Sequence, residues 1–232
     1  MRSGRAIFRK QLLDIFKNRM VLVQVFIYPI MALIMTELVA KSDDTIPNEM
    51  FVTMFAAMFV GMVPAIMTNM AIAEDREHKS LRFLVMAGVK PGEYLLGIGG
   101  FILLICSLVS VLFGLIGGFT GIVLVRLIAV LIVGSIASAL LGAIVGIFSR
   151  NQQAATALGI PIFMVLAFTP MLAQFNTTIH KVAGVLFSQQ VSILVNDTSA
   201  DAVKPFLVIG VNIVILTVVF MAVYHKKGLK SE

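Results

Sequence analysis

Six apolar segments, each about twenty residues or longer, dominate this chain of 232 residues. Because an α-helix rises 1.5 Å per residue, about twenty apolar residues are enough to cross the roughly 30 Å hydrocarbon core of a bilayer. We therefore predict an all-α membrane protein in which residues 1–232 form a single transmembrane domain with six transmembrane helices. The six segments cover approximately residues 20–40, 50–73, 94–116, 122–148, 154–173 and 205–224.

The composition agrees with this class of protein. Apolar residues make up 59% of the chain and charged residues 13%, whereas soluble domains contain about 45–50% and about 25%. The single cysteine, Cys106, lies within the third apolar segment, so we interpret it as a small buried apolar residue.

Lysine and arginine are unevenly distributed between the two sides of the predicted membrane. Fourteen lie on the side that holds both termini, and four lie on the opposite side. The positive-inside rule therefore predicts a multi-pass protein of the cytoplasmic (inner) membrane with both termini in the cytoplasm. Anionic lipid headgroups on that side account for the net charge of +6, so we expect no nucleic-acid partner.

A dense run of charge, from Glu74 to Arg82, separates the second and third apolar segments. Six of its nine residues are charged. Each would cost roughly 2.5–3.5 kcal/mol at the centre of a membrane helix, so the run must stand in water. Its apolar neighbours are typical of a surface that contacts a soluble partner. The residues that we expect at this contact are Glu74, Asp75, Arg76, Glu77, Leu81, Arg82, Phe83 and Leu84.

Residues 1–19 have the pattern of a short amphipathic helix next to the first span. Phe8, Leu12 and Phe16 fall on one side, and Lys10 and Lys17 fall on the other. Such a helix lies in the membrane interface with its basic edge toward lipid phosphates. Two interpretations remain open, an anchor alone or an anchor that also contacts a partner protein.

The loop at residues 174–204, on the outer side, carries an unexpected apolar stripe. Ile179, Val182, Leu186 and Phe187 follow the spacing of a one-sided helix, which Ser188–Gln190 would end. A loop that only joined two spans would not need this stripe. We therefore predict a short helix that lies on, or dips into, the outer leaflet.

Small residues recur every four positions in the fourth span, at Gly134, Ser138, Gly142 and Gly146. Such stripes allow helix backbones to approach closely in lipid, where apolar burial between helices gives no advantage. The stripe fits packing within the subunit or a seam between two subunits.

The sequence lacks the patterns of several enzymes and transporters. It contains no phosphate-binding Gly-x-x-x-x-Gly-Lys-Ser/Thr loop, no metal-ligand spacing and no catalytic triad at membrane depth. We also find no ionisable group deep in a predicted span, which disfavours a proton-coupled transporter or an intramembrane protease. A sodium-coupled mechanism through backbone carbonyls stays open, but an energy source outside the chain is simpler.

The charged run and the residues after it resemble the cytoplasmic hairpin of ABC-2-type transporter permeases. The resemblance rests on Ala73-Glu74-Asp75-Arg76-Glu77, on Leu81 and Leu84, on Ala87-Gly88-Val89, and on Glu93-Tyr94-Leu95-Leu96-Gly97. The order of the N-terminal helix, the six spans and the apolar outer loop is also similar. The chain departs from the family at Lys79-Ser80, where Gly-Thr is frequent, and at Gly88, where Pro is common.

This resemblance implies the permease subunit of an ATP-driven exporter without catalytic residues or cofactors of its own. ATP and Mg would bind a partner ATPase, on which residues 1–19 and the coupling segment 74–93 would dock. A second permease copy, identical or related, would complete the complex, and Ile179, Val182, Leu186 and Phe187 would line an outer gate.

The fourteen Met and seventeen Phe residues offer an adaptable apolar lining. This favours an amphipathic or hydrophobic substrate such as a peptide, lipid or drug. Two alternatives remain open, an immunity or accessory protein of the same fold and an ATP-independent channel or secondary transporter.

Overall fold

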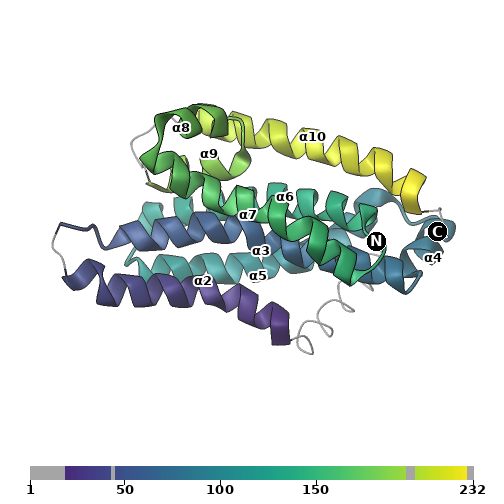
Figure 1. Ribbon diagram of the computed structural model, residues 1–232, viewed down its shortest axis with the longest axis horizontal. Helices are drawn as coiled ribbons and strands as arrows, with labels where there is room; N and C mark the ends of the chain where they lie inside the picture. Colours follow the sequence, from purple (N-terminus) through teal and green to yellow (C-terminus); the bar gives the residue numbers. More distant parts are fainter. Residues whose placement is uncertain (1–18, 43–44, 197–201, 229–232) are drawn as a thin grey trace.

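The computed structural model describes residues 19–42, 45–196 and 202–228. The long helices run side by side along the molecule (Figure 1), and six of the described helices are long and apolar enough to cross a membrane. They confirm the predicted all-α membrane fold. The amphipathic helix expected at residues 1–19, with Phe8, Leu12 and Phe16, falls outside the described residues except for Arg19. The six are α2 (Arg19–Leu38), α3 (Glu49–Glu77), α5 (Pro91–Ile116), α6 (Gly121–Phe148), α7 (Gln152–Phe175) and α10 (Val203–Gly228).

Shorter helices lie toward the two ends of the bundle. Helix α4 (Ser80–Met86) lies at the end that the charge bias assigns to the cytoplasm, and α8 (Thr177–Ala183) and α9 (Phe187–Asn196) lie toward the opposite end (Figure 1). A single 3-10 turn, Ala40–Ser42, follows α2. The chain turns between α5 and α6, where Gly118 and Gly121 adopt φ values of 66° and 59°, which glycine takes without steric cost.

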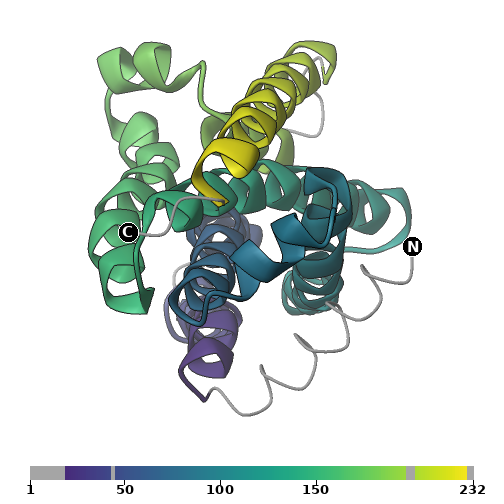
Figure 2. The ribbon, with the colours of Figure 1, turned by 90° about the vertical axis from the view of Figure 1, so that its right-hand side faces the viewer.

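Helix α3 occupies the centre of the bundle. It packs against α2, α5, α6, α7 and α9, and the view along the helices shows α10 (yellow) on the far side of α6 from α3 (Figure 2). In the most apolar 18-residue stretch of α3, 72% of the residues are buried, compared with 11% in the corresponding stretch of α10. The side chains of Ala56, Phe59 and Val60 are completely buried. The centre of the subunit is therefore filled by α3.

The small residues of α6 allow this packing. A Cβ atom added at Gly146 would lie 2.8 Å from the carbonyl oxygen of Asn69 in α3, and one at Gly134 would lie 2.5 Å from Cγ2 of Val191 in α9. At Gly142 the added atom would overlap the backbone carbonyl of Ala65. Ser138, between these glycines, is fully buried. In the structure the stripe thus faces neighbours in the same subunit.

The apolar outer loop folds differently from the prediction of one helix through Phe187. Helix α8 ends at Ala183, and α9 begins at Phe187 after a turn over residues 184–186. The polar residues expected to break the helix, Ser188–Gln190, are buried within α9. The side-chain amide of Gln190 donates a hydrogen bond to the carbonyl of Gly184, 2.5 Å away. This bond gives the buried side chain of Gln190 a partner in the turn between α8 and α9.

We predict that Gly142→Ala destabilises the protein, because its Cβ atom would meet backbone atoms that cannot move aside. Overpacking of this kind costs about 1–3 kcal/mol. The melting temperature of the detergent-solubilised protein, followed by size-exclusion chromatography, should fall. Gly210→Ala in α10 is the matched control, because nothing lies within 4 Å of its added Cβ atom. Equal melting temperatures for the two variants would contradict the prediction.

Candidate functional site

Helix α3 is longer than a membrane span. Its 29 residues extend about 43 Å at 1.5 Å per residue, compared with a hydrocarbon core of about 30 Å. The charged residues Glu74–Glu77 form its last turn, so they can stand beyond the core. The end of α3 therefore supports the segment that the sequence marks as exposed to water.

Three consecutive charged residues in this last turn bind three different helices. The Tyr94 hydroxyl of α5 donates a hydrogen bond to Oδ2 of Asp75 over 2.9 Å. The Arg76 guanidinium donates to the carbonyl of Ile147 in the last turn of α6. Glu77 Oε2 accepts a hydrogen bond from the backbone amide of Gln152, 3.1 Å away, at the start of α7. Because successive helical residues point about 100° apart, one turn of α3 reaches three neighbours.

These contacts also suit the helix ends that they join. A guanidinium near the last carbonyls of α6 and a carboxylate near the first amides of α7 both complement the helix dipoles. The start of α7 is closed further by Asn151, whose side chain accepts a hydrogen bond from the amide of Ala154 over 2.8 Å. The α6–α7 turn is thus fixed to the end of α3.

A tight turn connects α3 to α4. Lys79 adopts φ 59° and is the one non-glycine residue with positive φ among the described residues. Glycine takes this left-handed conformation readily, whereas a side chain costs roughly 1–2 kcal/mol. The permeases that the charged run resembles often have glycine at this position.

Helix α4 ends in a glycine-based cap. Gly88 has φ 76°, its amide donates to the carbonyl of Val85, and the amide of Val89 donates to the carbonyl of Leu84, both over 3.0 Å. Proline fixes φ near −65° and could not occupy position 88 of this turn. The departure from the family pattern at Gly88 therefore agrees with the observed geometry.

The structure divides the predicted contact residues between the interior and the surface. Asp75 and Leu81 are 3% and 1% exposed, so the expectation that the whole run stands in water is wrong for Asp75, and Leu81 belongs to the core of the subunit. Glu74, Arg76 and Leu84 are partly buried, whereas Glu77, Arg82 and Phe83 are exposed. Contact of these six with a partner stays a prediction.

Helix α4 presents a mixed apolar and basic surface. Phe83 and Met86 are 64% and 55% exposed, and Arg82 beside them is also exposed. The sequence analysis missed Met86, although its i+3 spacing from Phe83 places both on one helix face.

An aromatic cluster lies beneath this surface and was also missed. The ring centroids of Tyr94 and Tyr224 are 5.5 Å apart, and Phe220 packs on Tyr224 at 5.7 Å. The Tyr224 hydroxyl donates to the carbonyl of Val89 over 3.4 Å. Because Tyr94 also holds Asp75, the cluster connects α3, α5, α10 and the turn after α4.

The predicted outer-gate residues do not share one exposed face. Val182 of α8 is 72% exposed, whereas Phe187 of α9 is 2% exposed. Ile179 and Leu186 are partly buried. A gate role for the four residues stays a prediction.

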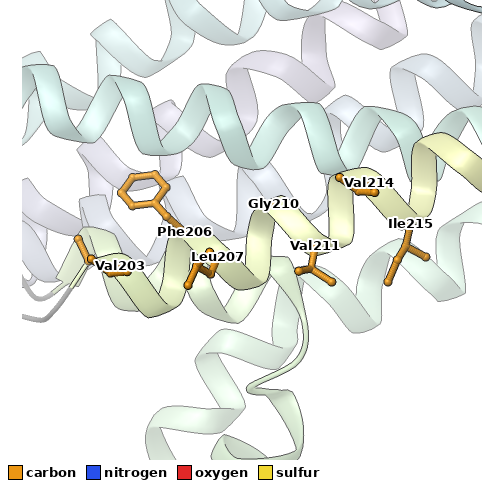
Figure 3. A pocket seen from close by; sticks show the side chains of 8 residues that line it. Val203, Phe206, Leu207, Gly210, Val211, Val214 and Ile215 are labelled. Atoms are coloured by element: carbon orange, nitrogen blue, oxygen red, sulfur yellow. The ribbon is translucent and has the colours of Figure 1, made fainter.

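Hollows that described residues line include two toward the end of the bundle opposite α4. One is formed by the start of α3, the α5–α6 turn and the end of α9, and its wall is about half polar. It has a volume of about 570 Å³ and is lined by Pro47, Glu49, Met50, Thr53, Gly118, Phe119, Thr120, Val123, Val195 and Asn196. The second is an open apolar face of α10 that includes Phe206, Leu207 and Val211 (Figure 3). Its composition suits contact with lipid chains.

The described residues contain no group of three or more His, Cys, Asp or Glu side chains that could hold a metal ion. They do contain a membrane bundle in which hydrogen bonds join α3 to α5, α6 and α7 at one end, next to a short exposed helix. These features define a multi-pass membrane protein whose candidate functional surface lies on α4.

Comparison with known proteins identifies the family. The family model described as ABC-2 family transporter protein matches residues 10–224, whereas a search of curated proteins finds no match. The chain therefore belongs to the ABC-2 transporter family, as the resemblance of residues 73–97 predicts. It is a membrane component of a transporter, and members of this family generally lack an ATPase site of their own.

We predict that Lys79→Gly stabilises the α3–α4 turn, because glycine removes the cost of the left-handed conformation at this position. The gain in free energy of unfolding should be up to about 1 kcal/mol, seen as a higher melting temperature in detergent. Lys90→Gly is the control, because Lys90 has φ −71° and carries no such cost. An equal or larger gain from Lys90→Gly would show that the backbone conformation of Lys79 is not the cause.

Proposed function

We propose that the chain is the permease subunit of an exporter that is driven by a separate cytoplasmic ATPase. The observation that carries this proposal is the surface of α4, where Arg82, Phe83 and Met86 are exposed beyond the end of the longest span. An apolar side chain surrounded by charged groups is the usual arrangement at the centre of a protein–protein contact. The ATPase would bind this surface.

The rigid base of α4 supports a role in coupling. Force that an ATPase applies to α4 would reach the end of α3, where Asp75, Arg76 and Glu77 bind α5, α6 and α7. A surface on a flexible loop would absorb such a displacement. ATP and Mg would bind the partner, because the sequence has no phosphate-binding loop of its own.

A second permease copy is needed to form a pathway. The centre of the described bundle is filled by α3, whose residues Ala56, Phe59 and Val60 are fully buried. A substrate therefore has no room to pass through the middle of one subunit. We propose that it passes between two copies, with both termini of each copy in the cytoplasm, as the distribution of Lys and Arg indicates.

The substrate class that we propose is amphipathic. The outer hollow places the carboxylate of Glu49 beside apolar groups such as Phe119 and Met50. A volume of about 570 Å³ lies in the range of small-molecule sites, which run from about 300 to 1,000 Å³. A molecule with an apolar body and a polar or cationic end fits such a wall.

The first test replaces the exposed apolar residues of α4. Phe83→Asp combined with Met86→Asp should abolish co-purification with the partner ATPase, because two charges would enter the centre of the contact. The variant should still insert in the membrane, since both side chains point away from the bundle. The readout is ATPase recovered per permease after affinity purification.

The matched control is His78→Asp, which places the same charge on an exposed residue of the same segment but off α4. This variant should retain the ATPase. Normal recovery with the double variant would refute α4 as the docking surface. Leu81→Asp is unsuitable for this purpose, because Leu81 is buried and its replacement tests folding.

The second test concerns the outer hollow. Glu49→Gln should lower ATP-dependent efflux of a cationic amphipathic dye about 2- to 5-fold, because an exposed charge pair rarely exceeds about 1 kcal/mol. Efflux of an uncharged dye of similar size should not change. The control is Glu37→Gln, because Glu37 already pairs with Lys41 at 2.6 Å. An equal loss in both variants, or for both dyes, would argue against a substrate contact at Glu49.

A further inference from the structure

Helix α10 lies at the edge of the bundle, where it packs mainly on α6 and α9 and touches α5 and α4 at its cytoplasmic end (Figure 1). Only 11% of the residues in its most apolar 18-residue stretch are buried, which is the smallest share among the six candidate spans. A Cβ atom added at Gly210 would meet nothing within 4 Å. Apolar interlocking with its neighbours is therefore sparse along much of the helix.

A directional contact joins α10 to the outer turn. The side-chain amide of Asn212 donates hydrogen bonds to the carbonyl of Val185, 3.0 Å away, and to the carbonyl of Val208 in its own helix, 2.8 Å away. Val185 lies in the turn between α8 and α9. An amide within a membrane span has no water to bind, so losing such a partner is costly.

A second directional contact joins α10 to the cytoplasmic turn. The Tyr224 hydroxyl donates to the carbonyl of Val89, in the turn between α4 and α5, over 3.4 Å. The Tyr224 ring also packs on Tyr94, whose hydroxyl holds Asp75 of α3. This end of α10 is thus fixed to the segment proposed to receive the ATPase.

The two contacts lie twelve residues apart, which is about 18 Å along a helix. An intact α-helix transmits a displacement over this length because its backbone hydrogen bonds resist stretching. Both contacts bind carbonyls in turns, where the backbone can move without breaking a helix. Helix α10 is therefore the element that joins the two turns directly.

We propose that α10 links the cytoplasmic α4–α5 turn to the outer α8–α9 turn, and that Tyr224, toward the end of α10, and Asn212, near its middle, are the positioning residues for these two contacts. A displacement of α4 would shift α10 through Tyr224, and Asn212 would carry the shift to Val185. The outer helices would then move with the ATPase cycle. This inference rests on the proposed function, because it requires an ATPase that acts on α4.

The test uses the permease co-purified with its ATPase and reconstituted in proteoliposomes. Asn212→Leu keeps the approximate size of the side chain and removes the donor, and Tyr224→Phe keeps the ring and removes the hydroxyl. Each should lower the amount of amphipathic fluorescent dye transported per ATP hydrolysed by about 2- to 10-fold, the range expected for one lost hydrogen bond. ATPase recovery and basal ATP hydrolysis should remain at the unmodified level.

A distance measurement separates coupling from general damage. Nitroxide labels at Val182 of α8 and Leu115 of α5, both largely exposed, report the position of the outer turn in a Cys106→Ala background. When the ATPase is trapped with MgATP and vanadate, the distance between the two labels should change in the otherwise unmodified complex. Asn212→Leu and Tyr224→Phe should reduce this change, and Asn212→Gln, which keeps an amide donor, should restore part of it.

Thr217→Val is the control, because Thr217 lies on α10 between the two contacts. It should not alter the amount of dye transported per ATP hydrolysed or the change in distance between the two labels. The proposed link is refuted if Asn212→Leu and Tyr224→Phe both keep the unmodified ratio and distance change, or if Thr217→Val lowers them equally. Absence of ATPase binding and ATP-dependent transport in the unmodified protein would instead refute the proposed function.

Discussion

The close approach of α3 and α6 determines how the rest of this subunit packs. In lipid, apolar side chains gain little by leaving one apolar environment for another, so association depends on close contact and satisfied polar groups. Gly142 and Gly146 bring the α6 backbone directly onto α3 at Ala65 and Asn69. This contact places α3 at the centre of the bundle. Helices α2, α5, α6 and α7 are then arranged around a helix that cannot shift laterally without opening the core.

The central position of α3 explains why the charged residues at its end can contact several helices at once. Asp75, Arg76 and Glu77 follow one another, so they point in different directions and meet the ends of three neighbouring helices. Placed on a peripheral helix, the same charges would face lipid or water on at least one side. The charged run therefore stabilises the bundle through its buried part, whereas Arg82, at its end, is exposed on α4 beside Phe83.

The sequence was sufficient for features that depend on length and composition, and insufficient for those that depend on distant contacts. The six spans follow from apolar length alone. The seven residues of α4 are too few for periodicity to separate buried Leu81 from exposed Phe83. The bond between Gln190 and Gly184 gives Gln190 a buried partner within α9, where the local pattern predicts a break. Tyr224 and Val89 are 135 residues apart, and no local pattern predicts such a pair.

A transporter subunit of this kind needs one part that stays fixed and another that moves, and the two differ in how they are held. Helix α3 is held by backbone contact on several sides, so small displacements there create overlap. Helix α10 is held by hydrogen bonds at Asn212 and Tyr224, and of the residues between them Phe220 is the one that is buried. Sliding α10 along α6 would expose few buried side chains, whereas tilting α3 would open the core. The physical asymmetry between these helices therefore favours motion at the edge of the bundle around a stationary centre.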